Sequence, residues 1–268
     1  MISHQIGIFE KNHRMFFQTN RVALAIFISC LLNIISCSES APVEVDQPEV
    51  NAPKVKAPTL VPNRYNVAFL IMDGVYNTEL TAPFDIFHHT IFRDSIKAMN
   101  VFLVANTNEP VTTFEGIRLI PDFNYLSDSL PRIDVLVVPS AEHHLDTDLE
   151  DEAMIRFVQQ VDREAQFVTS HCDGAFVLAK AGLLEGIVST TFPSDIEAMR
   201  KMFPQLDVRE NVLFVHDSKY ITSAGGAKSF EAALYLCEYL YGREVANRLA
   251  QGLVIDWNLA KVPHLVLD

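Results

Sequence analysis

The stretch that decides the fold runs from Phe167 to Lys180 and reads Phe-Val-Thr-Ser-His-Cys-Asp-Gly-Ala-Phe-Val-Leu-Ala-Lys. Its apolar first part predicts a strand, and the residues after Gly174 predict a helix. Cys172 is therefore expected at the sharp corner between them, where a side chain is exposed at the end of the strand. Gly174 leaves room for the helix to pack close to the strand.

Cys172 on this corner has two interpretations. The start of a helix favours negative charge, which stabilises a thiolate over a thiol and makes the side chain a nucleophile. A buried structural cysteine is the alternative, and it is favoured for an arbitrary cysteine. The small-x-Cys-x-Gly pattern from Ser170 to Gly174 favours the reactive thiol. Cys237, by contrast, lies in an apolar helical stretch and is interpreted as structural.

Apolar runs alternate with helix-compatible segments along the rest of the chain. Expected strands lie at 66–72, 101–105, 135–138, 212–215 and 220–222, with a hairpin at 112–120. Expected helices lie at 79–93, 146–164, 193–203, 230–241 and 244–253. This alternation predicts an α/β fold with a doubly wound, mostly parallel sheet. Ligands bind outside the carboxyl ends of such strands, where 73–79, 140–144 and 171–174 are expected.

Composition narrows the classes of function. The chain has 268 residues, of which 49% are hydrophobic and 21% charged, enough for one large domain or two small ones. The net charge of −13 argues against a nucleic-acid partner, because phosphate binding needs a basic surface. The Cys and His residues show no spacing typical of a metal site, so we expect no metal and no cofactor.

The first 63 residues are expected to lie outside the folded domain. A basic front end precedes a short apolar run, 22–35, which ends at Ile34-Ile35-Ser36-Cys37. This pattern resembles the bacterial lipoprotein signal, which implies removal of residues 1–36 and acylation of Cys37. A plain secretory signal with an incidental cysteine is the alternative. Residues 37–63 contain regularly spaced prolines and are interpreted as an extended tether.

The lipoprotein interpretation implies a location. We expect the protein in a bacterial cell envelope, anchored in the membrane by its lipid. Ser38 follows the acylated cysteine in place of the Asp that retains lipoproteins at the inner membrane of enteric bacteria. The outer membrane is therefore the expected site.

Four motifs together resemble the ThiJ/PfpI superfamily over residues 64–257. They are Glu79-Leu80-Thr81-Ala82-Pro83-Phe84-Asp85-Ile86-Phe87, the Cys172 corner, Ala181-Gly182-Leu183-Leu184-Glu185-Gly186 and Thr222-Ser223-Ala224-Gly225. The resemblance is nearest to isonitrile-hydratase-like proteins and to the ligand domains of AraC-type regulators. It implies the class I glutamine amidotransferase-like fold, a flavodoxin-like sandwich, for residues 64–268.

The resemblance also implies roles for individual residues. Cys172 is the nucleophile, and Glu79 holds or takes its proton. The backbone N–H groups of Asp173 and Ala141 stabilise an anion formed on the substrate. Ser140 and Ala141 stand where the family has a Gly-Gly pair. The further candidate pocket residues are His171, Ser140, His143, Thr191 and Phe192.

The chain departs from the family at its histidines. Many relatives carry a His where this chain has Phe192, and others place one directly after the nucleophile, where it has Asp173. His171 is expected to point away from Cys172. His143 and His144 either reach the pocket or lie on a solvent-exposed loop. Protease or amidase chemistry, which needs a base and a leaving-group acid, is therefore put in doubt.

Two classes of function follow. The first is a cysteine-dependent hydratase, hydrolase or lyase that acts on a small electrophilic carbon, such as an isonitrile or a reactive carbonyl, without the usual His partner. The second is a non-catalytic module that binds a ligand or senses oxidation in the same pocket. In both, the partner is a small molecule, and we expect a homodimer.

Overall fold

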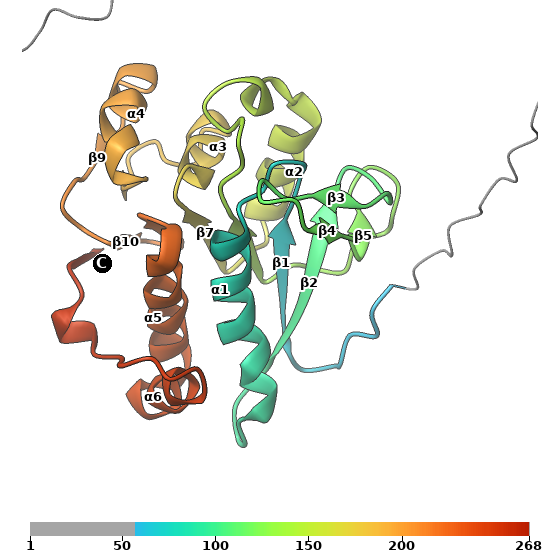
Figure 1. Ribbon diagram of the computed structural model, residues 1–268, viewed down its shortest axis with the longest axis vertical. Coiled ribbons are helices and arrows are strands. Elements are labelled where there is room, and N and C mark those ends of the chain that lie inside the picture. Colours follow the sequence, from blue (N-terminus) through green and yellow to red (C-terminus); the bar gives the residue numbers. More distant parts are fainter. Residues whose placement is uncertain (1–56, 268) are drawn as a thin grey trace, which may run out of the picture. The chain divides into compact units, whose positions relative to one another are not determined.

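The computed structural model describes residues 57–267, and their central element is an eight-stranded sheet (Figure 1). The strand order is β12-β10-β11-β7-β6-β1-β2-β5. Neighbouring strands are parallel except for the antiparallel pair β10 and β11. The bounds are β1 Tyr65–Leu70, β2 Met99–Ala105, β5 Phe123–Asn124, β6 Val135–Val138, β7 Phe167–His171, β10 Phe214–Asp217, β11 Tyr220–Ser223 and β12 His264–Leu267.

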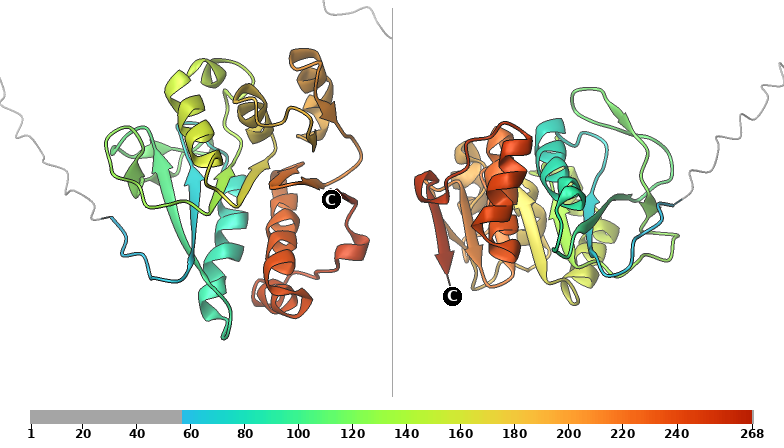
Figure 2. Two further views of the ribbon diagram at one scale, coloured as in Figure 1. Left: turned by 180° about the vertical axis from the view of Figure 1, so that it is seen from behind. Right: turned by 90° about the horizontal axis from the view of Figure 1, so that it is seen from below.

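Six α-helices of the described residues cover the two faces of this sheet (Figures 1 and 2). Helices α1, α5 and α6 share one buried cluster, and α2, α3 and α4 share the other. Their bounds are α1 Asn77–His88, α2 Glu152–Asp162, α3 Gly174–Lys180, α4 Ile196–Met202, α5 Ser229–Tyr241 and α6 Arg243–Gly252. Short 3-10 turns are η1 His89–Phe92, η2 Thr147–Glu150, η3 Pro193–Asp195, η4 Gly226–Lys228 and η5 Leu259–Lys261.

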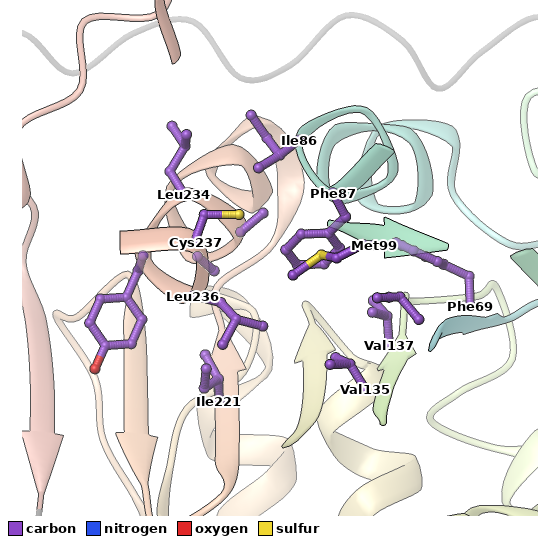
Figure 3. Close-up of a cluster of buried hydrophobic side chains, with 14 of the residues drawn as sticks. Phe69, Ile86, Phe87, Met99, Val135, Val137, Ile221, Leu234, Leu236 and Cys237 are labelled. Atoms are coloured by element: carbon purple, nitrogen blue, oxygen red, sulfur yellow. The ribbon is translucent and has the colours of Figure 1, made fainter. Parts of the chain in front are cut away.

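The alternation of side chains along β1 shows why both faces need helices. Val67 and Phe69 belong to the cluster with α1 and α5, whereas Ala68 and Leu70 belong to the cluster with α2 and α3. All four are fully buried. Figure 3 shows Phe69 among side chains of the first cluster, with Cys237 of α5 buried in it. A strand that is apolar on both faces is typical of a parallel sheet between helices.

The prediction of an α/β fold with a doubly wound, mostly parallel sheet is confirmed. The expected hairpin is also present, as β3 Val111–Thr112 paired antiparallel with β4 Arg118–Leu119. The prediction missed short strands such as β5, β12 and the pair β8 Val188–Ser189 and β9 Asp207–Val208. A strand of two to four residues carries too little pattern to be recognised.

The single helix expected at 146–164 is wrong, because the chain forms η2 and then α2. Asp151 separates them: its carboxylate accepts hydrogen bonds from the N–H groups of Ala153 (2.9 Å) and Met154 (3.0 Å). This is an N-cap, so a new helix begins after Asp151. The expected helix 193–203 likewise begins as the 3-10 turn η3.

Residues 1–56 lie outside the described part of the chain, and with them the expected signal, Cys37 and most of the tether. Between residues 57 and 267, none of the helices combines the length and the apolar character that crossing a membrane requires.

Candidate active site

Cys172 lies on a sharp turn between β7 and α3, at the carboxyl edge of the sheet. Its φ is +52°, in the left-handed region that residues other than glycine rarely adopt. The surrounding backbone holds it there, since the Cys172 N–H donates to the carbonyl oxygen of Ser223 on β11 at 2.9 Å. Left-handed strain that is fixed by its surroundings is typical of functional positions. The strand-to-helix corner expected from the sequence therefore exists.

Two glycines let the backbone close around this turn. A Cβ on Gly174 would lie 2.1 Å from the carbonyl oxygen of Val138, so the glycine allows α3 to approach the end of β6. Gly225 has a φ of +75°, and a Cβ there would lie 2.3 Å from the Cβ of Cys172. The Thr-Ser-Ala-Gly motif thus brings a backbone without a side chain against the cysteine.

Glu79 brings a carboxyl to the cysteine from the first turn of α1. Its Oε1 accepts a hydrogen bond from the Gly226 N–H at 3.0 Å, while its buried Oε2 makes no well-aligned hydrogen bond, although the Cys172 thiol and the Ser140 amide lie near the carboxyl. Burial raises the pKa of Glu79, and the carboxylate of Glu115 adds to the rise. The Gly226 amide, the nearby Cys172 thiol and the Ser140 amide oppose it. The carboxyl is therefore easier to protonate than an exposed glutamate.

The surroundings of Cys172 oppose the thiolate expected from the sequence. The sequence predicted a thiolate stabilised by the start of a helix, but burial raises the pKa of the Cys172 thiol, and the carboxylates of Glu79 and Asp173 raise it further. The Ser140 hydroxyl and the Asp173 amide oppose this only in part. Because α3 has seven residues, its helix dipole is small compared with two nearby carboxylates. These surroundings therefore favour the neutral thiol.

Asp173 supplies a second acid that sequence reasoning missed. Its Oδ2 lies 3.6 Å from the Cys172 sulfur, and its Oδ1 lies 3.1 Å from the hydroxyl of Thr191. Burial, followed by the carboxylates of Asp195 and Glu79, raises the pKa of Asp173 to about 7. The sequence analysis assigned a role to the backbone N–H of Asp173 and none to its side chain. Its position directly after the nucleophile was a signal that could have found it, because the sequence resemblance places a histidine there in some members of the family.

The backbone amides expected to stabilise an anion differ in the contacts that they already make. The Ala141 N–H donates to Nδ1 of His144 at 3.2 Å, and the Ser140 amide interacts with Glu79. The Asp173 N–H, in contrast, interacts with the Cys172 sulfur. The role of Asp173 N–H stays a prediction that the geometry allows. The role of Ala141 N–H stays a prediction that also requires the His144 ring to move.

The histidines near this edge are engaged elsewhere. Burial lowers the pKa of His144 to about 3, and its Nε2 lies 3.0 Å from the Met72 sulfur. His171 is also buried, with its pKa lowered to about 3, and its Nδ1 lies 2.9 Å from the Ser223 hydroxyl. It therefore contacts β11. His143 is half exposed and lies 3.3 Å from Asp146.

The other candidate pocket residues differ in exposure. The Thr191 hydroxyl is buried, 3.0 Å from the Cys172 carbonyl oxygen, and it positions the turn. The Ser140 hydroxyl is buried near the Cys172 thiol, whereas Phe192 is 38% exposed. A separate cavity of about 240 Å³ includes His143 and Met72 in its lining, but not Cys172. Among residues 57–267, no histidine hydrogen-bonds to the Cys172 thiol.

Asp173 makes stability depend on pH in a direction that can be checked. Its folded pKa of about 7 lies above the ordinary value of 3.8, so the folded state binds the proton more tightly than the unfolded state. The free energy of unfolding should therefore rise as the pH falls from 8 to 5, by at most about 1.4 kcal/mol per pH unit from this group. Asp173→Asn should be more stable than wild type at pH 8.

Urea unfolding of both proteins at pH 5, 6, 7 and 8 measures this effect. The difference between them should shrink toward pH 5, where the wild-type carboxyl is protonated. Glu152→Asn serves as the matched control, because Glu152 is exposed on α2. A constant difference across this range would contradict the raised pKa.

A nucleophile turn after a central strand, with an acid from the first helix beside it, defines a known class. The chain belongs to the DJ-1/PfpI family, whose model matches residues 65–239. It is 31% identical to isonitrile hydratase from Pseudomonas putida over 184 residues, which are 68% of this chain and 74% of that protein. The resemblance to the ThiJ/PfpI superfamily is confirmed, and with it the class I glutamine amidotransferase-like fold.

Solved structures share the fold. Drosophila melanogaster DJ-1beta superposes with a TM-score of 0.61 and 22% identity, over 72% of this chain and all of that one. An AraC family transcriptional regulator from Pseudomonas putida gives 0.59 and 19%, over 70% of this chain and 99% of that one. A ThiJ/PfpI family protein from Pseudomonas syringae gives 0.63 and 23%, over 75% and 82%. At these identities the likeness concerns the fold alone.

Proposed function

We propose that the protein is a cysteine-dependent enzyme that adds water to a small electrophilic carbon, as in an isonitrile or a reactive carbonyl. One observation carries the proposal: the buried carboxyl of Glu79, with a raised pKa, lies beside the Cys172 thiol. A carboxyl whose protonated form is favoured by burial, beside a thiol, suits a substrate that must gain a proton as it is attacked. The likeness to an isonitrile hydratase supports the same chemistry.

For an isonitrile the proposed steps balance without a cofactor. Glu79 gives its proton to the isonitrile carbon, Cys172 sulfur bonds to that carbon, and the thiol proton passes to Glu79. The product is a thioimidate on Cys172. The oxygen of a water molecule then bonds to the same carbon, and one of its protons goes to the imidate nitrogen. The carbon–sulfur bond breaks as the carbonyl forms, and the remaining hydroxyl proton passes to the sulfur. The net reaction converts an isonitrile and water into an N-substituted formamide.

Activity screening of the full chain tests this function. Alkyl isonitriles, 2-oxoaldehydes and small amides are incubated with wild type and with Cys172→Ala, and the products are followed by mass spectrometry. We expect turnover of the isonitriles or the oxoaldehydes by wild type alone. Turnover that Cys172→Ala retains would contradict the proposal, as would the absence of turnover for every substrate.

The second candidate is a non-catalytic ligand-binding module, and it is favoured by the engaged amides. An enzyme that forms an oxyanion needs free donors, yet Ala141 N–H is bonded to His144. Ligand binding fits the site better than oxidation sensing does, because the thiolate is the form that peroxide oxidises and the raised pKa of Cys172 disfavours it. The same screen separates these functions.

We also propose that Cys37 anchors the protein in the outer membrane of a bacterium. The support is the sequence pattern Ile34-Ile35-Ser36-Cys37 with the proline-spaced tail behind it. Two or more acyl chains make such an anchor effectively stable. The expected homodimer also stays a proposal.

Metabolic labelling with a palmitate analogue and fractionation of the membranes test the anchor. Wild type should carry label and sediment with the outer membrane, whereas Cys37→Ala should carry none and leave the membrane fraction once processed. Cys30→Ala is the matched control, since Cys30 would be removed with the signal. Unlabelled wild type would contradict the proposal.

A further inference from the structure

The side chain of Asp173 contacts the sulfur atom that the proposed reaction uses. Its Oδ2 lies 3.6 Å from the Cys172 sulfur, and the two groups form a side-chain hydrogen bond. Asp173 is 8% exposed, so this contact is shielded from bulk solvent. The residue directly follows Cys172 and precedes α3, so the turn that holds the nucleophile also holds the carboxyl. A proton can therefore pass directly between this carboxyl and the sulfur.

Thr191 fixes the orientation of the Asp173 carboxyl. The Thr191 hydroxyl lies 3.1 Å from Asp173 Oδ1 and 3.0 Å from the Cys172 carbonyl oxygen. Thr191 is buried, and the Thr190 N–H beside it donates to the Thr222 hydroxyl at 2.9 Å, which ties this segment to β11. Because a hydroxyl from a distant segment holds Oδ1, the other oxygen of the carboxyl stays directed at the sulfur.

The surroundings of Asp173 keep a proton available to it. Its pKa is raised to about 7 by burial and by the carboxylates of Asp195 and Glu79, against the hydrogen bonds from Thr191 and Cys172. An acid with a pKa near the working pH can both give and recover a proton. The titratable groups that face Asp173 are Asp195, Glu79, Cys172, Tyr76 and the neutral His144, whose ring accepts from the Asp173 amide.

The last step of the proposed reaction needs such an acid. The carbon–sulfur bond of the Cys172 adduct must break, and the sulfur leaves with the bonding electrons. Burial and nearby carboxylates raise the pKa of the Cys172 thiol, so departure as a bare thiolate is disfavoured. A proton that reaches the sulfur while the bond breaks removes this obstacle.

We propose that Asp173 is the general acid of the second half of the reaction, giving its proton to the Cys172 sulfur as the carbon–sulfur bond breaks. The inference rests on the proposed function, because it assigns a residue to one of its steps. The carboxylate left behind takes the hydroxyl proton of the tetrahedral adduct as the carbonyl forms, so Asp173 ends protonated, as it began. Glu79 protonates the substrate carbon, and Asp173 protonates the departing sulfur.

Asp173→Asn should stop the reaction after its first half. The full chain is incubated with an alkyl isonitrile, and both the formamide product and the mass of the protein are followed. We expect kcat to fall by about 10²- to 10⁴-fold, the usual contribution of a general acid. An adduct with the added mass of the isonitrile should accumulate, located on Cys172 by peptide mapping. Because Glu79 still forms this adduct, kcat/KM should fall much less than kcat.

Three further variants sharpen this experiment. Glu79→Gln should lose turnover and form no adduct, because it blocks the first half. Thr191→Val keeps the shape of the side chain but frees Asp173 Oδ1, so it should accumulate adduct to a smaller extent. Asp94→Asn, an exposed acid, is the matched control. Wild-type turnover by Asp173→Asn without an adduct, or loss of the adduct together with turnover, would overturn the assignment.

A second measurement does not depend on isonitriles. Methyl methanethiosulfonate converts Cys172 into its methyl disulfide at pH 9, and a phosphine then attacks the methyl-bearing sulfur, so that the Cys172 sulfur is the leaving group. The protonated Asp173 should assist its departure. At pH 6 we expect release to be at least about tenfold faster in wild type than in Asp173→Asn. The two rates should converge toward pH 9, where the wild-type carboxyl is ionised.

The two measurements distinguish failure of this inference from failure of the proposed function. If wild type gives neither product nor adduct with any isonitrile, the proposed function fails, but faster disulfide release by wild type at pH 6 still supports Asp173 as the acid that protonates the sulfur. Equal release rates at pH 6 would overturn that role, even where wild type hydrates an isonitrile.

Discussion

Glu79→Gln is expected to lower kcat/KM for the substrate found by screening by about 10²- to 10⁴-fold, the usual contribution of a positioned general acid. The glutamine keeps an oxygen that can accept the Gly226 N–H at 3.0 Å, so the first turn of α1 stays in place. It has no proton to give to the substrate carbon. In wild type the acid form is the active one, so activity should fall as the pH rises through the raised pKa of Glu79.

A second readout distinguishes this role from a structural one. The Glu79 carboxylate raises the pKa of Cys172, so its removal should lower that pKa and speed alkylation by iodoacetamide at pH 8. Turnover and alkylation then change in opposite directions, which local unfolding alone does not explain. Asp85→Asn, an exposed acid on the same helix, is the matched control. If Glu79→Gln leaves turnover and alkylation unchanged, the carboxyl does not act on the thiol.

The sequence was sufficient for the features that short segments determine. The apolar strand before Cys172 and Gly174 two residues after it are local signals, and both describe the turn that the structure contains. The match from Glu79 to Pro83 located the acid, because the first strand and first helix of a parallel sheet lead to its carboxyl edge. Each feature depends on neighbours in the chain.

The charge of the site could not be predicted, because it depends on contacts between distant segments. The bridge between Val75 and Ala141 joins the loop after β1 to the loop after β6. This bridge positions Tyr76 and the Ala141 amide, and no local sequence pattern predicts it. Similarly, the carboxylate of Asp195 raises the pKa of Asp173 because Thr191, four residues before Asp195, lies against the Cys172 turn. These contacts outweigh the helix-start effect that the sequence suggested for Cys172.

Gly225→Ala is expected to destabilise the protein strongly, for two separate reasons. Gly225 has φ +75° and ψ −155°, a conformation almost restricted to glycine, which costs other residues about 1–3 kcal/mol. A Cβ would also lie 2.3 Å from the Cβ of Cys172 and 2.6 Å from its nitrogen. Relieving such an overlap costs about another 1–3 kcal/mol, because backbone atoms must move.

Gly242→Ala separates these two contributions. Gly242 has φ +86° and ψ +161°, in the same glycine-favouring region as Gly225, but a Cβ there meets no atom within 4 Å. Urea unfolding should show Gly242→Ala destabilised by the backbone cost alone and Gly225→Ala by roughly twice as much or more. Only Gly225→Ala should also change the alkylation rate of Cys172, since the displaced atoms belong to the nucleophile turn. Equal destabilisation by the two substitutions would show that the Thr-Ser-Ala-Gly backbone does not press against Cys172.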